Sequence, residues 1–227
     1  MSAQDIFGIV AILYCVANLG SMGLELNLQE TIKSLRSPRL VTLTLVWSWI
    51  LGPALAILIT KILPLSEAHA AGLLLFSLAP TAPMLPILIR KAKADMDISA
   101  AMMPLAVVGT VVLMPLIAPI LIPGVSVSSF ALAKQLVLTV LLPLVAGVVI
   151  KVYASKLADK IFPYFKKLAG LTTLILLLFT LLMYGKELLN ALGSYAVAAQ
   201  VVFVLVTALV SYSFGFGMKQ SQRSALA

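Results

Sequence analysis

The sequence predicts an all-α integral membrane protein, and three observations support that prediction. Of its 227 residues, 62% are hydrophobic and only 11% are charged, whereas a soluble domain has about 25% charged residues. The mean hydropathy is +1.12. The apolar residues also form uninterrupted runs long enough to cross a bilayer as helices, which takes about 20 residues each. Short alternating segments typical of a membrane β-barrel are not seen.

Charged residues bound the first three predicted spans. The first run lies between Asp5 and Glu25, and the second lies between Arg39 and Lys61. The third is terminated by Arg90 and is interrupted by prolines, so we expect a broken helix there. These three predicted spans are residues 6–24, 40–60 and 68–89.

Four further spans follow, which gives about seven transmembrane helices in a single polytopic domain, residues 1–227. The turn-forming pair Pro123-Gly124 ends the fourth run, and Lys134 near the start of the fifth can reach the membrane interface. Lys167 and Lys186 bound the sixth. The segment 153–167 before it is predicted to be an interfacial loop or a short amphipathic helix. These four predicted spans are residues 98–122, 131–150, 168–185 and 195–218.

The basic residues predict the orientation, because cytoplasmic loops collect Lys and Arg. Alternate loops contain 13 basic residues on one side and 3 on the other, namely Lys61, Lys134 and Lys186. The larger set consists of Lys33, Arg36, Arg39, Arg90, Lys91, Lys93, Lys151, Lys156, Lys160, Lys166, Lys167, Lys219 and Arg223. We therefore expect a multi-pass protein of the cell's inner (plasma) membrane with its N-terminus outside and its C-terminus in the cytoplasm. The net charge is +8, and the Lys and Arg residues that produce it flank the apolar runs. This placement indicates contact with the lipid bilayer and not with nucleic acid.

The third span contains the strongest candidate site. Three prolines lie within seven residues between positions 80 and 86, and each removes a backbone donor and crowds the carbonyl four residues earlier. Transporters place their binding sites at such interrupted helices. The freed carbonyls and one hydroxyl would supply oxygen ligands for a small cation or polar substrate, from Ala79, Pro80, Thr81, Ala82 and Pro83. The alternative is a proline kink filled by neighbouring helices.

The fourth span supplies two further candidates, Ser99 and Thr110. It also contains three prolines, Pro104, Pro115 and Pro119, so two distorted helices are expected to cross near the middle of the membrane. The alternative for each hydroxyl is a local hydrogen bond to a backbone carbonyl.

The residues argue against an enzyme. His69 is the only histidine and Cys15 the only cysteine, and every Asp and Glu lies outside or at the edge of a predicted span. A zinc site needs three or four ligands, and a proton relay or intramembrane protease needs a deep carboxylate. No cofactor or metal is expected beyond sodium at Thr81.

Six motifs in order resemble the bile acid:sodium symporter family, in a bacterial branch. They are Ser21–Leu26 with Leu35–Leu40, Leu78–Pro86, Asp95–Ser99 with Pro115–Pro119, Leu142–Leu144, Ser211–Gly217 and Arg223–Ala227. The resemblance implies two inverted five-helix repeats, with a panel domain and a core domain in which two broken helices cross. It also implies that the seven spans correspond to the second to eighth family helices, so the second repeat is incomplete. The usual polar sodium ligands after the broken-helix proline are replaced here by residues 83–86.

These observations lead to a functional hypothesis with a stated alternative. We expect a secondary transporter of a small organic anion, coupled to a cation such as sodium, that works by alternating access at the broken helix. The alternative is a non-transporting membrane scaffold or subunit, or a truncated inactive fragment of such a transporter. A homo-oligomer or a partner chain remains open under either hypothesis.

Overall fold

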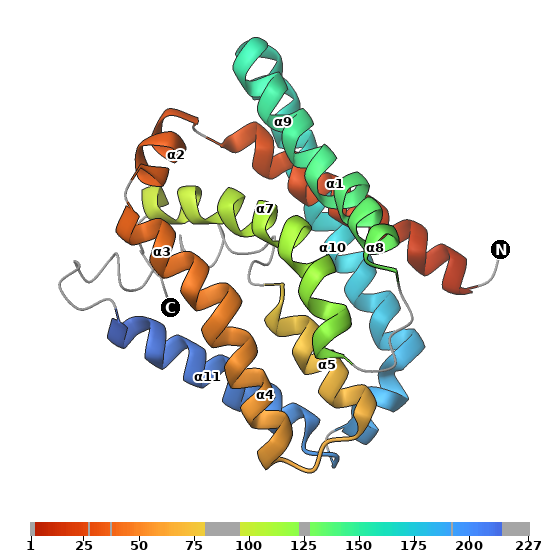
Figure 1. Ribbon diagram of the computed structural model, residues 1–227. Coiled ribbons are helices and arrows are strands. Elements are labelled where there is room, and N and C mark those ends of the chain that lie inside the picture. The colour runs from red at the N-terminus through yellow and green to blue at the C-terminus, as the bar shows by residue number, and fades with distance from the viewer. Residues whose placement is uncertain are drawn as a thin grey trace. The chain divides into compact units, whose positions relative to one another are not determined.

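A computed structural model describes residues 3–26, 28–36, 38–79, 96–122, 128–191 and 193–214. Every regular element in these ranges is a helix, as Figure 1 shows. Four helical stretches among the described residues are long and apolar enough to cross a membrane, and two shorter apolar helices accompany them. The four are Ala3–Glu25, Pro104–Leu121, Ser129–Tyr153 and Ser155–Ala191. The prediction of an all-α integral membrane protein is therefore confirmed.

The described helices overlap the predicted spans, with one additional helix, and with one helix, α10 (Ser155–Ala191), that extends well beyond its predicted span. α2 (Leu28–Leu35) is a short helix that the sequence did not predict, between the first and second spans. The predicted third and seventh spans each continue beyond the residues that the structure describes. The elements are α1 (Ala3–Glu25), α3 (Pro38–Val46), η1 (Trp47–Leu51), α4 (Gly52–Ile62), α5 (Glu67–Ser77), α7 (Met96–Leu121), α8 (Ser129–Leu136), η2 (Val137–Leu141), α9 (Leu142–Tyr153), α10 (Ser155–Ala191) and α11 (Ala196–Phe214).

The chain divides into two compact units. Unit 1 comprises residues 1–28 and 131–189, and unit 2 comprises residues 29–130 and 190–227. Unit 1 therefore contains α1, α9 and most of α8 and α10, whereas unit 2 contains α3, α4, α5, α7 and α11. The single membrane domain and the inverted repeat remain predictions.

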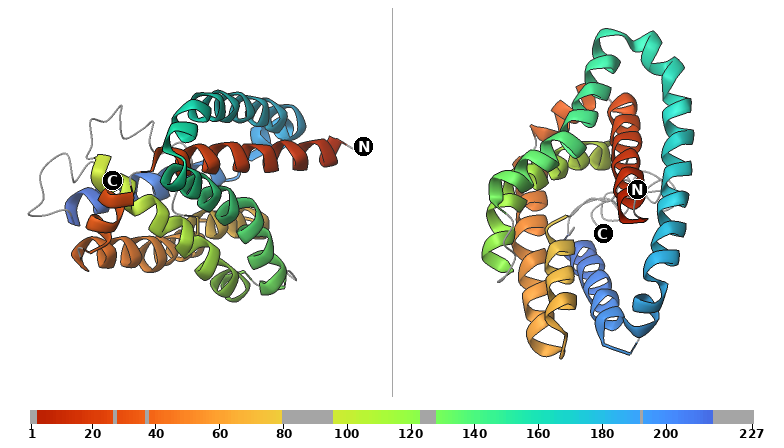
Figure 2. Two further views of the ribbon diagram at one scale, coloured as in Figure 1. Left: turned by 90° about the horizontal axis from the view of Figure 1, so that it is seen from above. Right: turned by 90° about the vertical axis from the view of Figure 1, so that its right-hand side faces the viewer.

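In unit 1, α1 lies between α9 and α10 (Figure 2). The approach of α1 to α9 depends on glycines, which let two helix backbones come close together. A Cβ added to Gly23 would overlap the Leu144 carbonyl oxygen and lie 2.9 Å from the Val148 nitrogen. Gly147 faces α1 in the same way, because its added Cβ would lie 2.5 Å from the Gly20 carbonyl oxygen. The crossing is therefore a backbone-to-backbone contact.

Polar and aromatic side chains join α1 to α10. The amide of Asn18 donates to the Tyr14 carbonyl at 2.9 Å and reaches the Thr173 hydroxyl at 3.5 Å. Further along, the rings of Phe7 and Tyr184 meet edge to face with centroids 6.0 Å apart. These side-chain contacts link α1 to the part of α10 between Thr173 and Tyr184.

α10 is much longer than the predicted span 168–185. It is continuous from Ser155 to Ala191, 37 residues, with non-helical backbone angles at Tyr184. The segment 153–167, predicted as an interfacial loop or a short amphipathic helix, is mostly the first part of this long helix. Lys, Leu and Ala favour helix, and buried Ala158 anchors this part against the unit.

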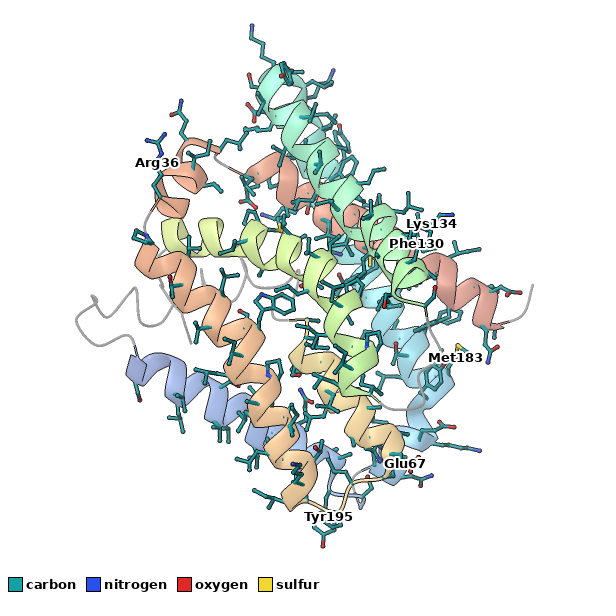
Figure 3. All side chains as sticks on the ribbon, viewed as in Figure 1. Arg36, Glu67, Phe130, Lys134, Met183 and Tyr195 are labelled. Atoms are coloured by element: carbon teal, nitrogen blue, oxygen red, sulfur yellow. The ribbon has the colours of Figure 1, made fainter. Side chains whose placement is uncertain are left out.

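Unit 2 has its own apolar core. The buried residues of this core come from α4, α5, the end of α7 and α11: Ala56, Ile59, Leu73, Leu74, Ile122, Ala199 and Phe203. Phe76 and Phe203 pack edge to face with centroids 5.9 Å apart. Glu67, at the start of α5, and Tyr195, just before α11, lie at the same end of this unit (Figure 3). α5 thus runs from that end into the unit.

Two spans share an unusual internal plan. In each span, a five-residue π-helical turn lies in mid-helix, and the second residue of the helix that follows is a proline. The turn η1 is followed by Gly52-Pro53, and the turn η2 is followed by Leu142-Pro143. The second turn begins 90 residues after the first. Proline clashes with the carbonyl four residues earlier in an α-helix, and the wider π turn relieves that clash. The Leu142 N–H accordingly donates to the Val137 carbonyl, five residues back.

Candidate functional site

The predicted break in the third span begins where α5 ends. α5 stops at Ser77, and Leu78 after it is completely buried. The Leu78 N–H is shared between the carbonyls of Leu74 and Leu75, at 3.3 and 3.2 Å, and the Ala79 N–H donates to the Phe76 carbonyl at 3.1 Å. These bonds tighten the last turn. The helix therefore ends inside unit 2, before the first proline of the run.

Of the candidate residues at the break, Ala79 is described and is exposed. Pro80, Thr81, Ala82 and Pro83 lie outside the described residues, so their proposed role stays a prediction. The described end of α5 does supply one oxygen that the sequence analysis did not select. The Ser77 hydroxyl is buried and donates to the Leu74 carbonyl at 2.7 Å. Its oxygen keeps free lone pairs, at the negative end of a helix dipole that favours a cation.

α7, which contacts α3 and α5, carries the other two candidates. The Thr110 side chain is half-buried, and its hydroxyl donates to the Ala106 carbonyl at 2.8 Å. This is the local bond foreseen as the alternative for Thr110, and its oxygen can still accept. Ser99 lies in the first part of α7, and its side chain is outside the described set. α7 bends part-way along its length (Figure 1), as expected for a helix containing Pro104, Pro115 and Pro119.

Trp49 is a residue that the sequence analysis missed. It lies in η1 with 8% of its surface exposed, and its indole Nε1 has no hydrogen-bond partner among the described residues. The ring packs against Gly109 of α7, where an added Cβ would lie 2.9 Å from Nε1. A buried N–H without an acceptor costs about 1–3 kcal/mol. Unit 2 thus has a buried N–H donor without an acceptor among the described residues, and it packs against Gly109, the residue before Thr110.

The polar groups that could form a site around the end of α5 and the middle of α7 are few and uncharged among the described residues. Ser77 and Thr110 provide hydroxyl oxygens, Trp49 provides a donor, and Pro115 leaves the Val111 carbonyl without its usual helical donor. In the part of the chain that the structure describes, no group of three His, Cys, Asp or Glu side chains could hold a metal. Neutral oxygens of this kind suit a hard monovalent cation or a polar ligand.

Comparison with known proteins decides the family. The model of the sodium bile acid symporter family matches residues 12–191. The chain belongs to this family. It is 23% identical over 193 residues, 85% of the chain, to the probable chloroplastic sodium/metabolite cotransporter BASS3 of Oryza sativa subsp. japonica. The corresponding BASS3 of Arabidopsis thaliana is 23% identical over 89% of the chain.

A third relative in the symporter family matches a shorter stretch. The probable chloroplastic sodium/metabolite cotransporter BASS2 of Oryza sativa subsp. japonica is 29% identical over 62% of the chain. The chain spans about half the length of the curated BASS3 relatives, 46% and 48% respectively. The resemblance inferred from the six sequence motifs is therefore confirmed.

The missed residues Trp49 and Ser77 had weak signals in the sequence. Trp49 precedes Gly52-Pro53 by a few residues inside an apolar span, which favours a local departure from α-helix there. Ser77 stands three residues before the first proline of the run. The hydroxyl candidates chosen from the sequence all lie within or after the proline run, so neither Trp49 nor Ser77 was among them.

Proposed function

We propose that this protein is a secondary transporter that moves a small organic anion together with sodium, by alternating access. It would act in the cell's inner membrane with its N-terminus outside and its C-terminus in the cytoplasm. Membership of a symporter family supports the proposal, as do relatives named as sodium/metabolite cotransporters. The observation that carries it is the end of α5 inside unit 2, at fully buried Leu78.

The described polar groups and the predicted site residues beside them are assigned to three roles. The end of α5, with Ser77 and the predicted ligands Ala79 to Pro83, would hold sodium, because carbonyls at the C-terminal ends of broken helices coordinate cations in transporters. Thr110 and Ser99 of α7 would line the path of the anion. The Trp49 N–H would donate to the anion or to a water that accompanies it.

The test is sodium uptake by the full-length protein in lipid vesicles. We expect uptake of radioactive ²²Na⁺ to rise when acetate, lactate, succinate or taurocholate is added outside. Ser77→Ala should weaken the sodium dependence by about tenfold or more, because a hydrogen-bonding or ligating group contributes about 1.5–3 kcal/mol to a charged partner.

A matched pair of threonines separates site effects from helix effects. Thr110→Val is expected to reduce anion-stimulated uptake. Thr180→Val removes a hydroxyl with the same local bond, 2.8 Å to the carbonyl four residues earlier, but on an exposed part of α10. It should leave uptake unchanged. If none of these anions stimulates sodium uptake and the protein binds no sodium, the proposal is overturned and a membrane scaffold is favoured.

A further inference from the structure

The first part of α10 presents a straight basic stripe, defined by Lys156, Lys160 and Lys167. The three positions are four and seven residues apart, so they lie within about 40° of one another around the helix. All three side chains are exposed. The opposite face packs on unit 1: Ala158 and Ala169 are buried, and the Phe165 ring lies against Gly20. The basic stripe therefore points away from the unit's core.

The charge of the stripe is not neutralised within the described residues. The Asp159 carboxylate forms an ion pair with Lys151 of α9, with Nζ and Oδ1 2.7 Å apart. Lys166 lies off the stripe, with its ammonium 5.6 Å from the centre of the Phe162 ring. Lys156, Lys160 and Lys167 form no ion pair with any residue that the structure describes. Three like charges in a row attract a partner with several negative charges.

The length of α10 places the stripe at the membrane surface. Its 37 residues extend over about 55 Å, whereas the hydrocarbon core is about 30 Å thick. The apolar part starts directly after Lys167. The stripe therefore begins at the edge of the hydrocarbon and continues outward past the lipid headgroups.

Aromatic side chains support that placement. Tyr164 is 69% exposed, and Tyr153 at the end of α9 is 86% exposed. Exposed tyrosines are enriched at the level of the headgroups, where the ring is in an apolar layer and the hydroxyl is in water. Tyr164 lies one turn from Lys160 on the same helix. Lysines and tyrosines thus occur together where headgroup phosphates are found.

We propose that the basic stripe of α10 binds the headgroups of anionic phospholipids in the leaflet that it enters. Lysine ammonium groups bind phosphate oxygens as compact point charges on flexible stems. Basic clusters directly beside a transmembrane helix recognise anionic lipids in this way, with a strength that falls as salt rises. Binding would fix the depth of α10 in the bilayer.

The test measures which lipids the purified full chain retains. The protein in detergent is offered phosphatidylglycerol and phosphatidylcholine in equal amounts, and bound lipid is counted by native mass spectrometry. We expect preferential retention of phosphatidylglycerol, reduced several-fold by the combined variant Lys156→Gln, Lys160→Gln and Lys167→Gln. The corresponding arginine substitutions should keep the preference, because they keep the charge.

A charge-matched control removes three other lysines. Lys61→Gln, Lys134→Gln and Lys186→Gln together lower the net charge equally, at exposed positions outside the stripe, and should leave the preference intact. An equal drop in both triple variants would overturn the proposal, because it would show a general charge effect. Displacement of the lipid by the same concentration of inorganic phosphate would also overturn it, in favour of a free-phosphate site.

Folding is checked by circular dichroism before lipid is counted. Should the triple stripe variant lose helix, Lys156→Gln with Lys160→Gln is measured in its place. An unchanged preference for phosphatidylglycerol in that folded double variant overturns the proposal. A reduced preference supports it.

Discussion

Gly23→Ala should lower the free energy of unfolding of unit 1 more than a glycine-to-alanine substitution at any other position in α1. The added Cβ would overlap the Leu144 carbonyl oxygen, lie 2.9 Å from the Val148 nitrogen and 3.0 Å from the Gly147 Cα. All three atoms belong to the backbone of α9, so no side chain can rotate away. The two helices must separate, or one must shift along the other.

The expected size of the Gly23→Ala effect follows from two opposing contributions. Overpacking where two backbones meet costs about 1–3 kcal/mol, and each weak Cα–H···O hydrogen bond broken at the crossing adds about 0.5–1 kcal/mol. Alanine recovers about 1 kcal/mol of helix propensity relative to glycine. With one such bond broken, we expect a net decrease of about 0.5–3 kcal/mol in the free energy of unfolding.

Gly8→Ala provides the matched control in the same helix. An added Cβ at Gly8 meets nothing within 4 Å, so this variant should be neutral or slightly more stable. Both variants are compared by SDS titration in detergent, with helix content followed by circular dichroism. Equal unfolding midpoints for Gly23→Ala and Gly8→Ala would refute the backbone contact between α1 and α9.

Two further predictions concern side chains that join helices within a unit. Gly109→Ala should displace the Trp49 ring, because an added Cβ lies 2.9 Å from its Nε1 and Cζ2 atoms. In a Trp47→Phe background, Trp49 is the only tryptophan, and we expect its fluorescence emission maximum to shift. An unchanged emission spectrum would contradict the packing of Trp49 on Gly109. Asn18→Ala should destabilise unit 1 by about 1 kcal/mol, the usual size of an interhelical polar contact in a membrane. Since Asn18 reaches Thr173 at only 3.5 Å, a double-mutant cycle with Thr173→Val should give a coupling energy below about 1 kcal/mol, and a larger value would contradict that long distance.

Most of the fold could be predicted because hydropathy alone determines where helices cross a bilayer. Each predicted span contains a helix among its described residues, and α7 (Met96–Leu121) lies within two residues of the predicted span 98–122 at both ends. The first part of α10 was harder to predict. Its lysines indicate a solvated segment, but their spacing puts Lys156, Lys160 and Lys167 on one face and leaves Ala158 and Phe165 to pack on the other.

The candidate site could be predicted only in part. The prolines after Ala79 correctly indicated that the helix would not continue smoothly, because α5 ends at Ser77. Which polar groups face the interior could not be predicted, since that depends on packing between helices distant in sequence. Trp49 was missed because its N–H is unusual only once Gly109 of α7 is seen to cover the ring without accepting a hydrogen bond.

The π turns η1 and η2 change how the faces of their spans should be assigned. A π turn adds one residue to a helix without adding a loop, so everything after it is rotated by about 100° relative to a straight α-helix. The lipid-facing positions of α3 therefore cannot be extended into α4 by counting in threes and fours, and the same holds between α8 and α9. A relative that lacks the extra residue would present a different set of side chains to its neighbours over the second half of the span. Alignments of these two helices should accordingly place single-residue gaps within 47–51 and 137–141, and mutagenesis that assumes continuous periodicity would target the wrong face.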